Sequence, residues 1–347
     1  MKLLVTIPFS KTANPAPFLL YEEMDDLDVQ IRSCSLRRLI FGAWDVWHLH
    51  WPAENILSET NRPRAIAKLV LFWARLKVAK AKNVKIFWTV HNLKPHEVRR
   101  PALERIFWSL FLPNVDGLIL MSRSTMQKVH REWPRLSACP TFIVPHGHYR
   151  GAYADEVDRE GARVKLGLDA SDFVVTFFGQ IRPYKGVPNL IRCFRQMGQH
   201  GTCLMVAGRP LDQDIALEIR TAAAGDPKVR LHLEWVRQDF VQYFLRAADL
   251  IVLPYTEILN SGSALLALSF DRPILLPAII AIPELCELLS GNWVRLYEGE
   301  LTSEVLSDAV QWAKQRPGGD APAPLDALDW NRLAKLTLAG FRKVDRN

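Results

Sequence analysis

The sequence predicts an α/β protein made of two doubly wound parallel sheets. Its 347 residues, 49% of them hydrophobic, exceed what one ordinary core holds, so two domains are expected. In both halves, short runs rich in β-branched and aromatic residues alternate with helical patterns, and several runs end directly in polar loops. Ligands bind at the carboxyl ends of strands in such sheets, so two domains of this kind that face each other would form a cleft.

Six strands are expected in each half. The runs of the first half lie at residues 2–7, 29–33, 46–49, 84–90, 117–121 and 141–144, of which 29–33 is the weakest. Those of the second half lie at residues 174–178, 202–207, 229–233, 250–253, 274–276 and 293–296. A polar linker at 151–164 separates the halves, and a Pro/Gly/Ala-rich stretch at 317–324 precedes a terminal helix. The expected domains are therefore 1–155 and 156–325, followed by a terminal helix at 326–347.

Composition argues against several protein classes. The five cysteines are scattered without a Cys-x-x-Cys pair, which disfavours a disulfide framework or a zinc site and favours the cytoplasm. No secretory signal precedes the first strand, and no apolar run reaches the roughly 18 to 20 residues that span a bilayer. No Gly-x-Gly-x-x-Gly sequence follows the first strand, so a dinucleotide-dependent oxidoreductase or epimerase is also disfavoured.

The net charge of +7 comes from the first half of the chain. Residues 1–150 hold 22 Lys and Arg against 12 Asp and Glu, a balance of +10, and the remainder holds 22 against 25, or −3. Residues 61–85 contain no acidic residue, and their pattern predicts a helix with one basic and one apolar stripe. The basic stripe holds Lys68, Arg75 and Lys82, and the apolar stripe holds Ile66, Leu69, Val70, Trp73 and Leu76. Such a helix suits an anionic membrane surface, although a surface helix that packs on a sheet has the same pattern. Nucleic acid is not an expected partner, because no recognition motif accompanies the basic patch.

A phosphate-binding loop is expected at residues 177–186. A continuously apolar strand ends at Gly179, where the backbone can turn sharply, and Arg182 and Lys185 follow just before a helical pattern. The N–H groups and the dipole of a helix N-terminus favour an anion, and the two cations add full charges. An ordinary strand–loop–helix connection with solvated basic side chains would have the same residues.

Loops after later strands add candidates for the same ligand. The candidates all follow an expected strand or open a helix, and they are Gly208, Arg209, Val236, Arg237, Tyr255, Glu257, Ser261, Gly262 and Ser263. Small residues and hydroxyls at the start of an apolar helix favour a second anion cradle at 261–263. Glu257 could accept hydrogen bonds from ribose hydroxyls, and Val236 with Arg237 could flank a base.

With these residues the chain resembles the GT-B glycosyltransferases, which hold the diphosphate of a nucleotide sugar in their second domain. The matching positions are Arg182, Lys185, Gly208 and Ser261-Gly262-Ser263. The resemblance covers nearly the whole chain and implies that the helix at 326–347 crosses back to the first domain. The large retaining family usually carries two glutamates separated by seven residues, whereas Leu265 stands where the partner of Glu257 would be.

The first half is similar to a narrower group. Segments 45–52, 88–97 and 144–149 resemble the GDP-mannose:glycolipid 4-beta-D-mannosyltransferases of xanthan-type exopolysaccharide biosynthesis. This resemblance implies inverting transfer of mannose from GDP-mannose to the glucuronic acid end of a polyprenyl-diphosphate-linked oligosaccharide, by a peripheral or monotopic enzyme on the cytoplasmic face of the inner membrane. Two alternatives stay open: a retaining GT-B transferase that uses another nucleotide sugar, and a non-catalytic membrane-surface scaffold with a degenerate transferase fold.

Inverting transfer needs one base near the acceptor hydroxyl and electrophilic help for the departing diphosphate. Glu97 is the first candidate for the base and His91 the second, because both follow a buried strand in a loop expected to face the cleft. The acceptor side is expected to be lined by His48, His50, Trp51 and His146. No metal is expected, because built-in cations can supply the charge and the run Asp212-Gln213-Asp214 is interpreted as helix capping.

Overall fold

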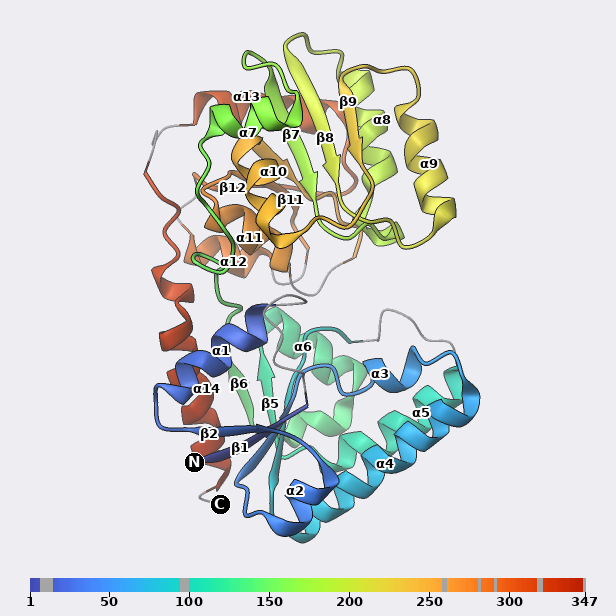
Figure 1. The fold of residues 1–347 in the computed structure, drawn as a ribbon, viewed down its shortest axis with the longest axis vertical. Helices are drawn as coiled ribbons and strands as arrows, with labels where there is room; N and C mark the ends of the chain where they lie inside the picture. Colours follow the sequence, from blue (N-terminus) through green and yellow to red (C-terminus); the bar gives the residue numbers. More distant parts are fainter. Residues whose placement is uncertain are drawn as a thin grey trace. The chain divides into compact units, whose positions relative to one another are not determined.

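A computed structural model confirms the α/β class and contains two parallel six-stranded sheets (Figure 1). It describes residues 1–6, 15–93, 100–257, 261–279, 282–289, 292–316 and 321–345. The chain divides into two compact units, one made of Met1–Gly147 with Leu328–Asn347 and the other of His148–Ala327. The end of the chain therefore belongs to the same unit as its beginning.

The sheet of the first unit has the strand order β2-β1-β3-β4-β5-β6. Its strands are β1 (Lys2–Val5), β2 (Gln30–Ser33), β3 (Val46–Leu49), β4 (Lys85–Thr89), β5 (Gly117–Leu120) and β6 (Thr141–Ile143). Residues of β3 and β5 are buried throughout, as expected for parallel strands covered on both faces. The chain passes to opposite sides of β1 for β2 and β3, so ligands are expected where the neighbours β1 and β3 end.

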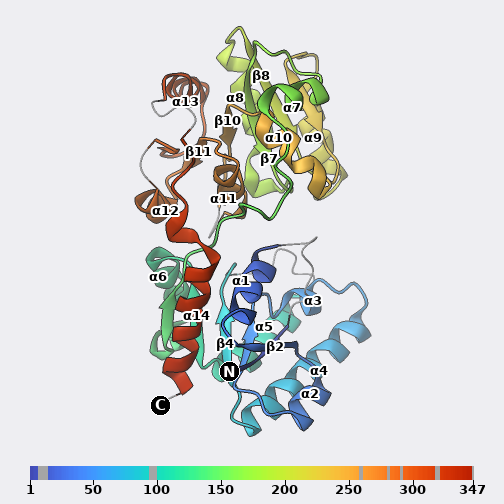
Figure 2. The same cartoon turned by 60° about the vertical axis from the view of Figure 1, so that its left-hand side comes forward.

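Helices cover this sheet on both faces. They are α1 (Pro15–Asp25), α2 (Leu36–Phe41), α3 (Glu54–Leu57), α4 (Arg62–Ala81), α5 (Pro101–Phe111), α6 (Arg123–Glu132) and α14 (Trp330–Asp345), with 3-10 turns at η1 (Leu112–Asn114) and η2 (Pro134–Ala138). The side chains of Asn61 and Ser122 cap α4 and α6 by accepting the N–H groups of residues three positions on. The last helix, α14, packs along α1 and on strands β4, β5 and β6 (Figure 2).

The sheet of the second unit has the order β12-β11-β10-β7-β8-β9. Its strands are β7 (Phe173–Phe178), β8 (Thr202–Ala207), β9 (Val229–His232), β10 (Leu250–Val252), β11 (Ile274–Pro277) and β12 (Val294–Tyr297). Strand β7 is flanked by β8 and β10, so the switch point of this sheet lies between β7 and β10. The expected phosphate loop follows β7, and Tyr255 lies in the loop that follows β10.

The remaining elements of the second unit are mostly helices between the strands. They are α7 (Arg159–Leu166), η3 (Pro183–Lys185), α8 (Val187–Met197), α9 (Gln213–Ala223), η4 (Gln238–Phe240), α10 (Val241–Ala247), α11 (Gly262–Ser269), α12 (Ile282–Leu288) and α13 (Ser303–Gln315), and a 3-10 turn, η5 (Asp326–Leu328), ends at the start of the other unit. No helix in the described parts of the chain combines the length and apolar character needed to cross a bilayer.

One fully buried cation ties α7 to the second sheet. The side chain of Arg163 is 1% exposed and donates to the carbonyls of Ala170 and Asp172 at 2.8 and 2.7 Å. It also pairs with Asp249, whose carboxylate accepts the N–H of Val174 at 2.7 Å. These bonds fix the residues just before β7 and β10, at the amino ends of the two strands.

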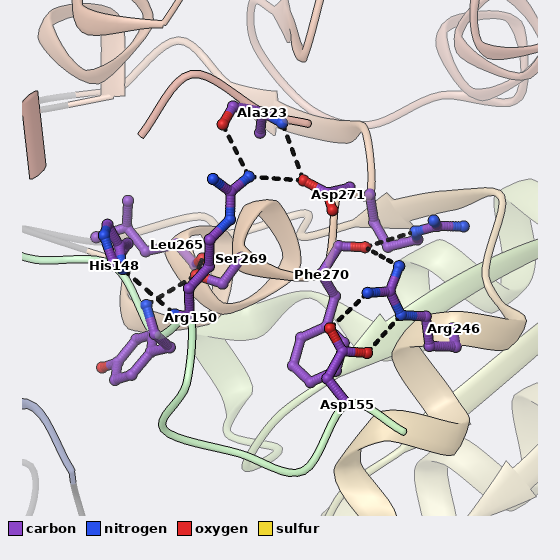
Figure 3. Close-up of polar contacts among 11 residues, drawn as sticks. His148, Arg150, Asp155, Arg246, Leu265, Ser269, Phe270, Asp271 and Ala323 are labelled. Atoms are coloured by element: carbon purple, nitrogen blue, oxygen red, sulfur yellow. Dashed lines mark hydrogen bonds and ion pairs between the residues drawn. The ribbon is translucent and has the colours of Figure 1, made fainter. Parts of the chain in front are cut away.

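Both segments that join the second unit to the first are held by residues at the end of α11 (Figure 3). The Arg150 guanidinium pairs with Asp271 at 2.7 Å and donates to the Ala323 carbonyl at 2.8 Å. Asp271 also accepts the N–H of Ala323 at 2.9 Å. Just upstream, the N–H of Tyr149 donates to Ser269 at 2.8 Å. The first and last segments of this unit are thus tied to one helix.

Candidate functional sites

The expected phosphate loop and the loop after β8 meet at two glycines. Gly179 and Gly208 directly follow β7 and β8, with φ of +134° and +147°. A Cβ on Gly208 would stand 1.9 Å from the Gly179 carbonyl oxygen, and a Cβ on Gly179 would stand 2.8 Å from the Ser263 hydroxyl. Only glycine therefore fits at either position, because a side chain would collide with the protein itself and both backbones have a positive φ.

Lys185 brings a desolvated cation to this place. Its side chain is buried, and its Nζ lies 3.6 Å from the point where a Cβ of Gly179 would be and 5.2 Å from the centre of the Tyr255 ring. Burial lowers the pKa of its ammonium, and Arg182 lowers it further, while Tyr184 opposes the change. Among the described residues no carboxylate forms an ion pair with Lys185. A bound anion would supply the missing counter-charge.

The start of α11 completes this cradle. Ser261 caps the helix by accepting the N–H of Ala264 at 3.1 Å, and its hydroxyl is 3.5 Å from that of Tyr255. A Cβ on Gly262 would lie 3.1 Å from the Tyr149 hydroxyl, so a second tyrosine borders the helix start. Burial raises the pKa of both tyrosines, so their hydroxyls stay protonated and can donate to an anion. We define the donor cradle as Gly179, Lys185, Gly208, Tyr255, Ser261, Gly262 and Ser263.

The other residues expected to bind the donor are half-buried or exposed and lie outside the donor cradle. Arg182 is half-buried at the start of η3, and Arg209 is exposed, with its carbonyl accepting the N–H of Ile181. Arg237 is 76% exposed after β9 and pairs with Asp239 at 2.8 Å, next to the half-buried Val236. Glu257 is exposed beyond β10. In the described structure, no hydrogen bond or ion pair joins Val236, Arg237 or Glu257 to the donor cradle, so their roles stay proposals.

In the first unit, His48 and His50 of the expected acceptor side and His91, the second candidate for the base, belong to one chain of hydrogen bonds. Nε2 of His91 bonds Nδ1 of His50 at 2.7 Å, and Nε2 of His50 bonds the Tyr21 hydroxyl at 2.7 Å. The same hydroxyl bonds Nδ1 of His48 at 2.9 Å, and Nε2 of His48 bonds the Thr89 hydroxyl at 2.7 Å. We call these five residues the His–Tyr chain. Tyr21 lies in α1, His48 lies in β3, and Thr89 is the last residue of β4. His50 follows the end of β3 directly, and His91 lies two residues beyond the end of β4.

A cavity of about 30 Å³, partly open to the surface, borders this chain. Its lining includes His50, His91 and Thr89 of the chain together with His146 and Trp330. Trp51 stacks on His91, with ring centres 4.1 Å apart and planes at 20°. His48, which we expected to line the acceptor side, has no exposed surface and packs against Phe341 at 5.1 Å between ring centres, so it lies behind the lining. The volume accommodates a water or a hydroxyl group beside the histidines.

Burial keeps the four histidines of this region neutral. It lowers the pKa of His48 to about 3, with a further contribution from His91. The pKa values of His50 and His91 lie well below the ordinary value for the same reason, with added repulsion from neighbouring histidines including His146. Burial also lowers the pKa of His146, against the hydrogen bond it makes with the Gly147 carbonyl. Neutral imidazole is the form that can accept a proton.

Two further expectations concern the base and metals. Glu97, the first candidate for the base, lies outside the described residues. Asp212 caps α9 by accepting the N–H of Ile215 at 3.0 Å, which confirms its interpretation as a capping residue. Within the described ranges, no three His, Cys, Asp or Glu side chains are placed to hold a metal ion.

Helix α4 differs from the stripes expected for it. Its buried face consists of Ala65, Leu69, Phe72, Leu76 and Ala79. Ile66, Val70 and Trp73 are instead exposed by 44%, 58% and 41%, and Nζ of Lys77 lies 5.5 Å from the Trp73 ring centre. We call these four residues the α4 surface. Two cations of the expected basic stripe have protein partners: Lys68 pairs with Glu59, and Lys82 donates to the carbonyls of Ile40 and Gly42.

Sequence reasoning missed several residues of both sites. Tyr21 and Thr89 belong to the His–Tyr chain, and Tyr149 borders the start of α11. Thr89 could have been found, because the register of β3 with β4 carries it toward His50 once the strands are paired. Tyr21 and Tyr149 carry no local signal, since each reaches its partners from a distant segment.

Comparisons with known proteins bear on these sites. Residues 172–310 match the family model of group 1 glycosyl transferases. The chain is 33% identical over 346 residues to a GDP-mannose:glycolipid 4-beta-D-mannosyltransferase of Xanthomonas campestris pv. campestris, over 96% of this chain and 90% of that protein. Two solved structures share the fold at 14% identity. Sucrose-phosphate synthase of Thermosynechococcus elongatus has a TM-score of 0.65 over 99% of this chain and 94% of that one. Anabaena HepE in complex with UDP has a TM-score of 0.63 over 99% and 97%.

Proposed function

The chain belongs to the group 1 glycosyltransferases with the GT-B fold, and from this premise we propose that it is an inverting mannosyltransferase. Its donor is GDP-mannose, and its acceptor is the glucuronic acid end of a polyprenyl-diphosphate-linked oligosaccharide in xanthan-type exopolysaccharide biosynthesis. The name of the Xanthomonas relative supports the donor and the glycolipid class of acceptor.

One observation carries the proposal: the ammonium of Lys185 is buried beside Gly179 and Tyr255 without a carboxylate partner in the described structure. Burying a cation in this way is unfavourable unless an opposite charge joins it. The diphosphate of a nucleotide sugar supplies two such charges. Arg182, which lies just upstream of Lys185, adds a second cation to the same loop.

Inverting transfer proceeds in one displacement. The acceptor oxygen attacks C1 of the sugar while the bond from C1 to the diphosphate breaks, and positive charge develops on the sugar ring. Lys185 stabilises the negative charge that collects on the departing diphosphate, and the hydroxyls of Ser261, Ser263 and Tyr255 are placed to donate to the same group. The protein's own cations thus provide the electrophilic help that we expect to replace a metal ion. Leu265, buried in α11, offers no carboxylate at the position typical of the retaining family.

The base belongs to the first unit in this proposal. His91 lines the cavity, is neutral, and is held between Trp51 and His50, which suits a group that must accept a proton at a fixed position. Glu97 remains the other candidate. The single variants Glu97→Gln and His91→Gln distinguish the two candidates. The variant that lacks the true base should lose transfer and keep its binding of GDP.

The α4 surface supports contact with a membrane. Ile66, Val70 and Trp73 lie on one face at helical spacing, and Lys77 stands next to them. A tryptophan beside a cation on an exposed apolar face is typical of helices that lie at the headgroup boundary. A lipid-linked acceptor requires the enzyme to work at such a boundary, so we place it on the cytoplasmic face of the inner membrane.

Donor binding and turnover test the function. Thermal shift with GDP-, UDP- and ADP-sugars should show the largest stabilisation with GDP-mannose. Acceptor-dependent release of GDP should follow when the glucuronic-acid-ended lipid-linked oligosaccharide is added. A non-catalytic scaffold would release no GDP, and a retaining transferase would give the opposite anomer, which the coupling constants of the new linkage identify.

A further inference from the structure

The His–Tyr chain joins two points of one cavity. Its ends are His91 and Thr89, and both line the cavity of the first unit, while Tyr21 and His48 connect them from behind. The four links are 2.7 to 2.9 Å long; three join buried groups, and the link from His50 to the half-buried His91 is partly buried. Each member carries one exchangeable proton when it is neutral and can both donate and accept.

This arrangement addresses a difficulty in using His91 as a base. Burial and the neighbouring histidines disfavour a positive charge on any ring of the cluster. The titratable groups that face one another here are Tyr21, His48, His50, His91 and His146, and no Asp, Glu, Lys or Arg is among the described residues that line the cavity. An imidazole that had to keep the proton would therefore be a weak base. An imidazole that passes a proton on at once would not need to hold a charge.

We propose that the His–Tyr chain is a proton relay, in which a proton taken up at His91 is matched by one released at Thr89, with Tyr21 as the positioning residue at its centre. The proposal rests on the proposed function, since the proton comes from the acceptor hydroxyl. It adds Tyr21, His48 and Thr89 to the residues on which turnover depends.

The relay conserves protons at every step. The acceptor O–H bond breaks, its electron pair forms the bond to C1 of the sugar, and the C1–O bond to the diphosphate breaks with its electron pair on the diphosphate. The proton joins Nδ1 of His91, whose Nε2 proton moves to Nδ1 of His50, whose Nε2 proton moves to the Tyr21 hydroxyl. That hydroxyl passes its own proton to Nδ1 of His48, Nε2 of His48 passes its proton to Thr89, and Thr89 releases its own to a cavity water that exchanges with solvent. Every member ends neutral, with its hydrogen bond reversed.

Removing a hydroxyl from the chain tests the relay in the full-length protein. Tyr21→Phe and Thr89→Val each remove one link with little change of shape, and Thr89→Ser restores the link. The matched control is Thr141→Val, because Thr141 lies in β6 of the same unit, outside the described lining of the cavity, and its hydroxyl donates to the Cys139 carbonyl at 3.0 Å. The readouts are kcat and KM with GDP-mannose and the lipid-linked acceptor, the proton inventory in mixtures of H2O and D2O, and the affinity for GDP alone.

We expect Tyr21→Phe and Thr89→Val to lower kcat at least tenfold with little change in the KM for GDP-mannose or in GDP affinity. The double variant should be no slower than the slower single variant, because a chain is broken only once. Thr89→Ser should recover most of the turnover that Thr89→Val loses. The wild-type proton inventory should be curved, as when several protons move together, and should become linear in the variants.

Three results would overturn the relay. These are wild-type kcat in Tyr21→Phe and Thr89→Val, multiplied losses in the double variant, and an equal loss in Thr141→Val. Failure of the proposed function itself looks different: the wild-type protein would release no GDP in response to acceptor, and the relay would fall with it. If wild-type transfer occurs and the variants match it, only the relay fails.

Discussion

Gly208 and Gly179 approach so closely that a methyl group on the first would stand 1.9 Å from the carbonyl oxygen of the second. Both residues directly follow neighbouring strands, and the N–H of Gly179 donates to the Ala207 carbonyl at 3.0 Å. The pair lies next to Lys185 and the start of α11, because the Cβ position of Gly179 is 3.6 Å from Nζ of Lys185 and 2.8 Å from the Ser263 hydroxyl. A clash between a new side chain at Gly208 and the Gly179 carbonyl would involve backbone atoms, so rotation of a side chain could not relieve it.

Gly208→Ala should disrupt the donor cradle. The new Cβ must push the Gly179 backbone away and must also adopt a positive φ, so we expect a loss of about 3 kcal/mol in stability and loss of GDP binding. Gly201→Ala is the matched control, since Gly201 has a φ of +66° with nothing within 4 Å of its Cβ position. It should cost about 1 to 2 kcal/mol and keep GDP binding. Urea denaturation and thermal shift with GDP measure both, and normal GDP binding by Gly208→Ala would contradict the arrangement.

Lys185→Met should lower kcat/KM by about a hundredfold, the effect of removing one group that stabilises a departing anion. Methionine fills the volume of the lysine stem, so the loss reports the charge. Lys228→Met is the control, because Lys228 is half-exposed and pairs with Asp172 in the loops at the amino ends of the strands. Steady-state release of GDP at fixed acceptor gives both values. A Lys185→Met enzyme with near-normal kcat/KM would remove the ammonium from the donor cradle.

Much of the fold could be predicted because its strands are parallel and buried. A run such as Phe173–Phe178 is apolar at nearly every position, so it stands out from the helices on either side. Twelve expected runs match twelve strands in the described structure. The loop glycines were found for a related reason: Gly179 and Gly208 each directly follow such a run, where a sharp turn is required.

The side-chain arrangements could not be predicted with equal success. Helix α4 has apolar residues around most of its circumference, so periodicity alone does not say which stripe is buried; Phe72 and Ala65 face the core in place of Trp73 and Ile66. Tyr21 reaches His48 and His50 across 27 and 29 residues of sequence. Contacts of that range depend on how α1 packs on the sheet.

Stability should fall as the pH drops below about 6.5, because of the buried histidines. Above this value His48 is neutral in both the folded and the unfolded chain. Between 6.5 and about 3 the unfolded chain takes up a proton on this ring while the folded chain does not, so protonation favours unfolding. Each such histidine can contribute up to about 1.4 kcal/mol per pH unit.

Urea denaturation at pH 7.5, 6.5 and 5.5 measures this dependence. His48→Gln should show a shallower fall than the wild-type chain, whatever its stability at pH 7.5. Equal slopes for His48→Gln and the wild-type chain would mean that the buried ring does not control the pH response.

The α4 surface should determine how the protein partitions onto membranes. Val70→Ser with Trp73→Ser removes two exposed apolar side chains without touching the buried face of α4, so the fold should persist. We expect the bound fraction on phosphatidylglycerol-containing vesicles to fall at least tenfold in partition coefficient, since burial of each large apolar side chain is worth about 1.5 kcal/mol or more. Leu217→Ser is the control, because Leu217 is 66% exposed on the second unit and should not affect binding. Co-sedimentation with these vesicles gives the partition coefficient. If the double variant binds as the wild-type chain does, another face of the protein meets the membrane.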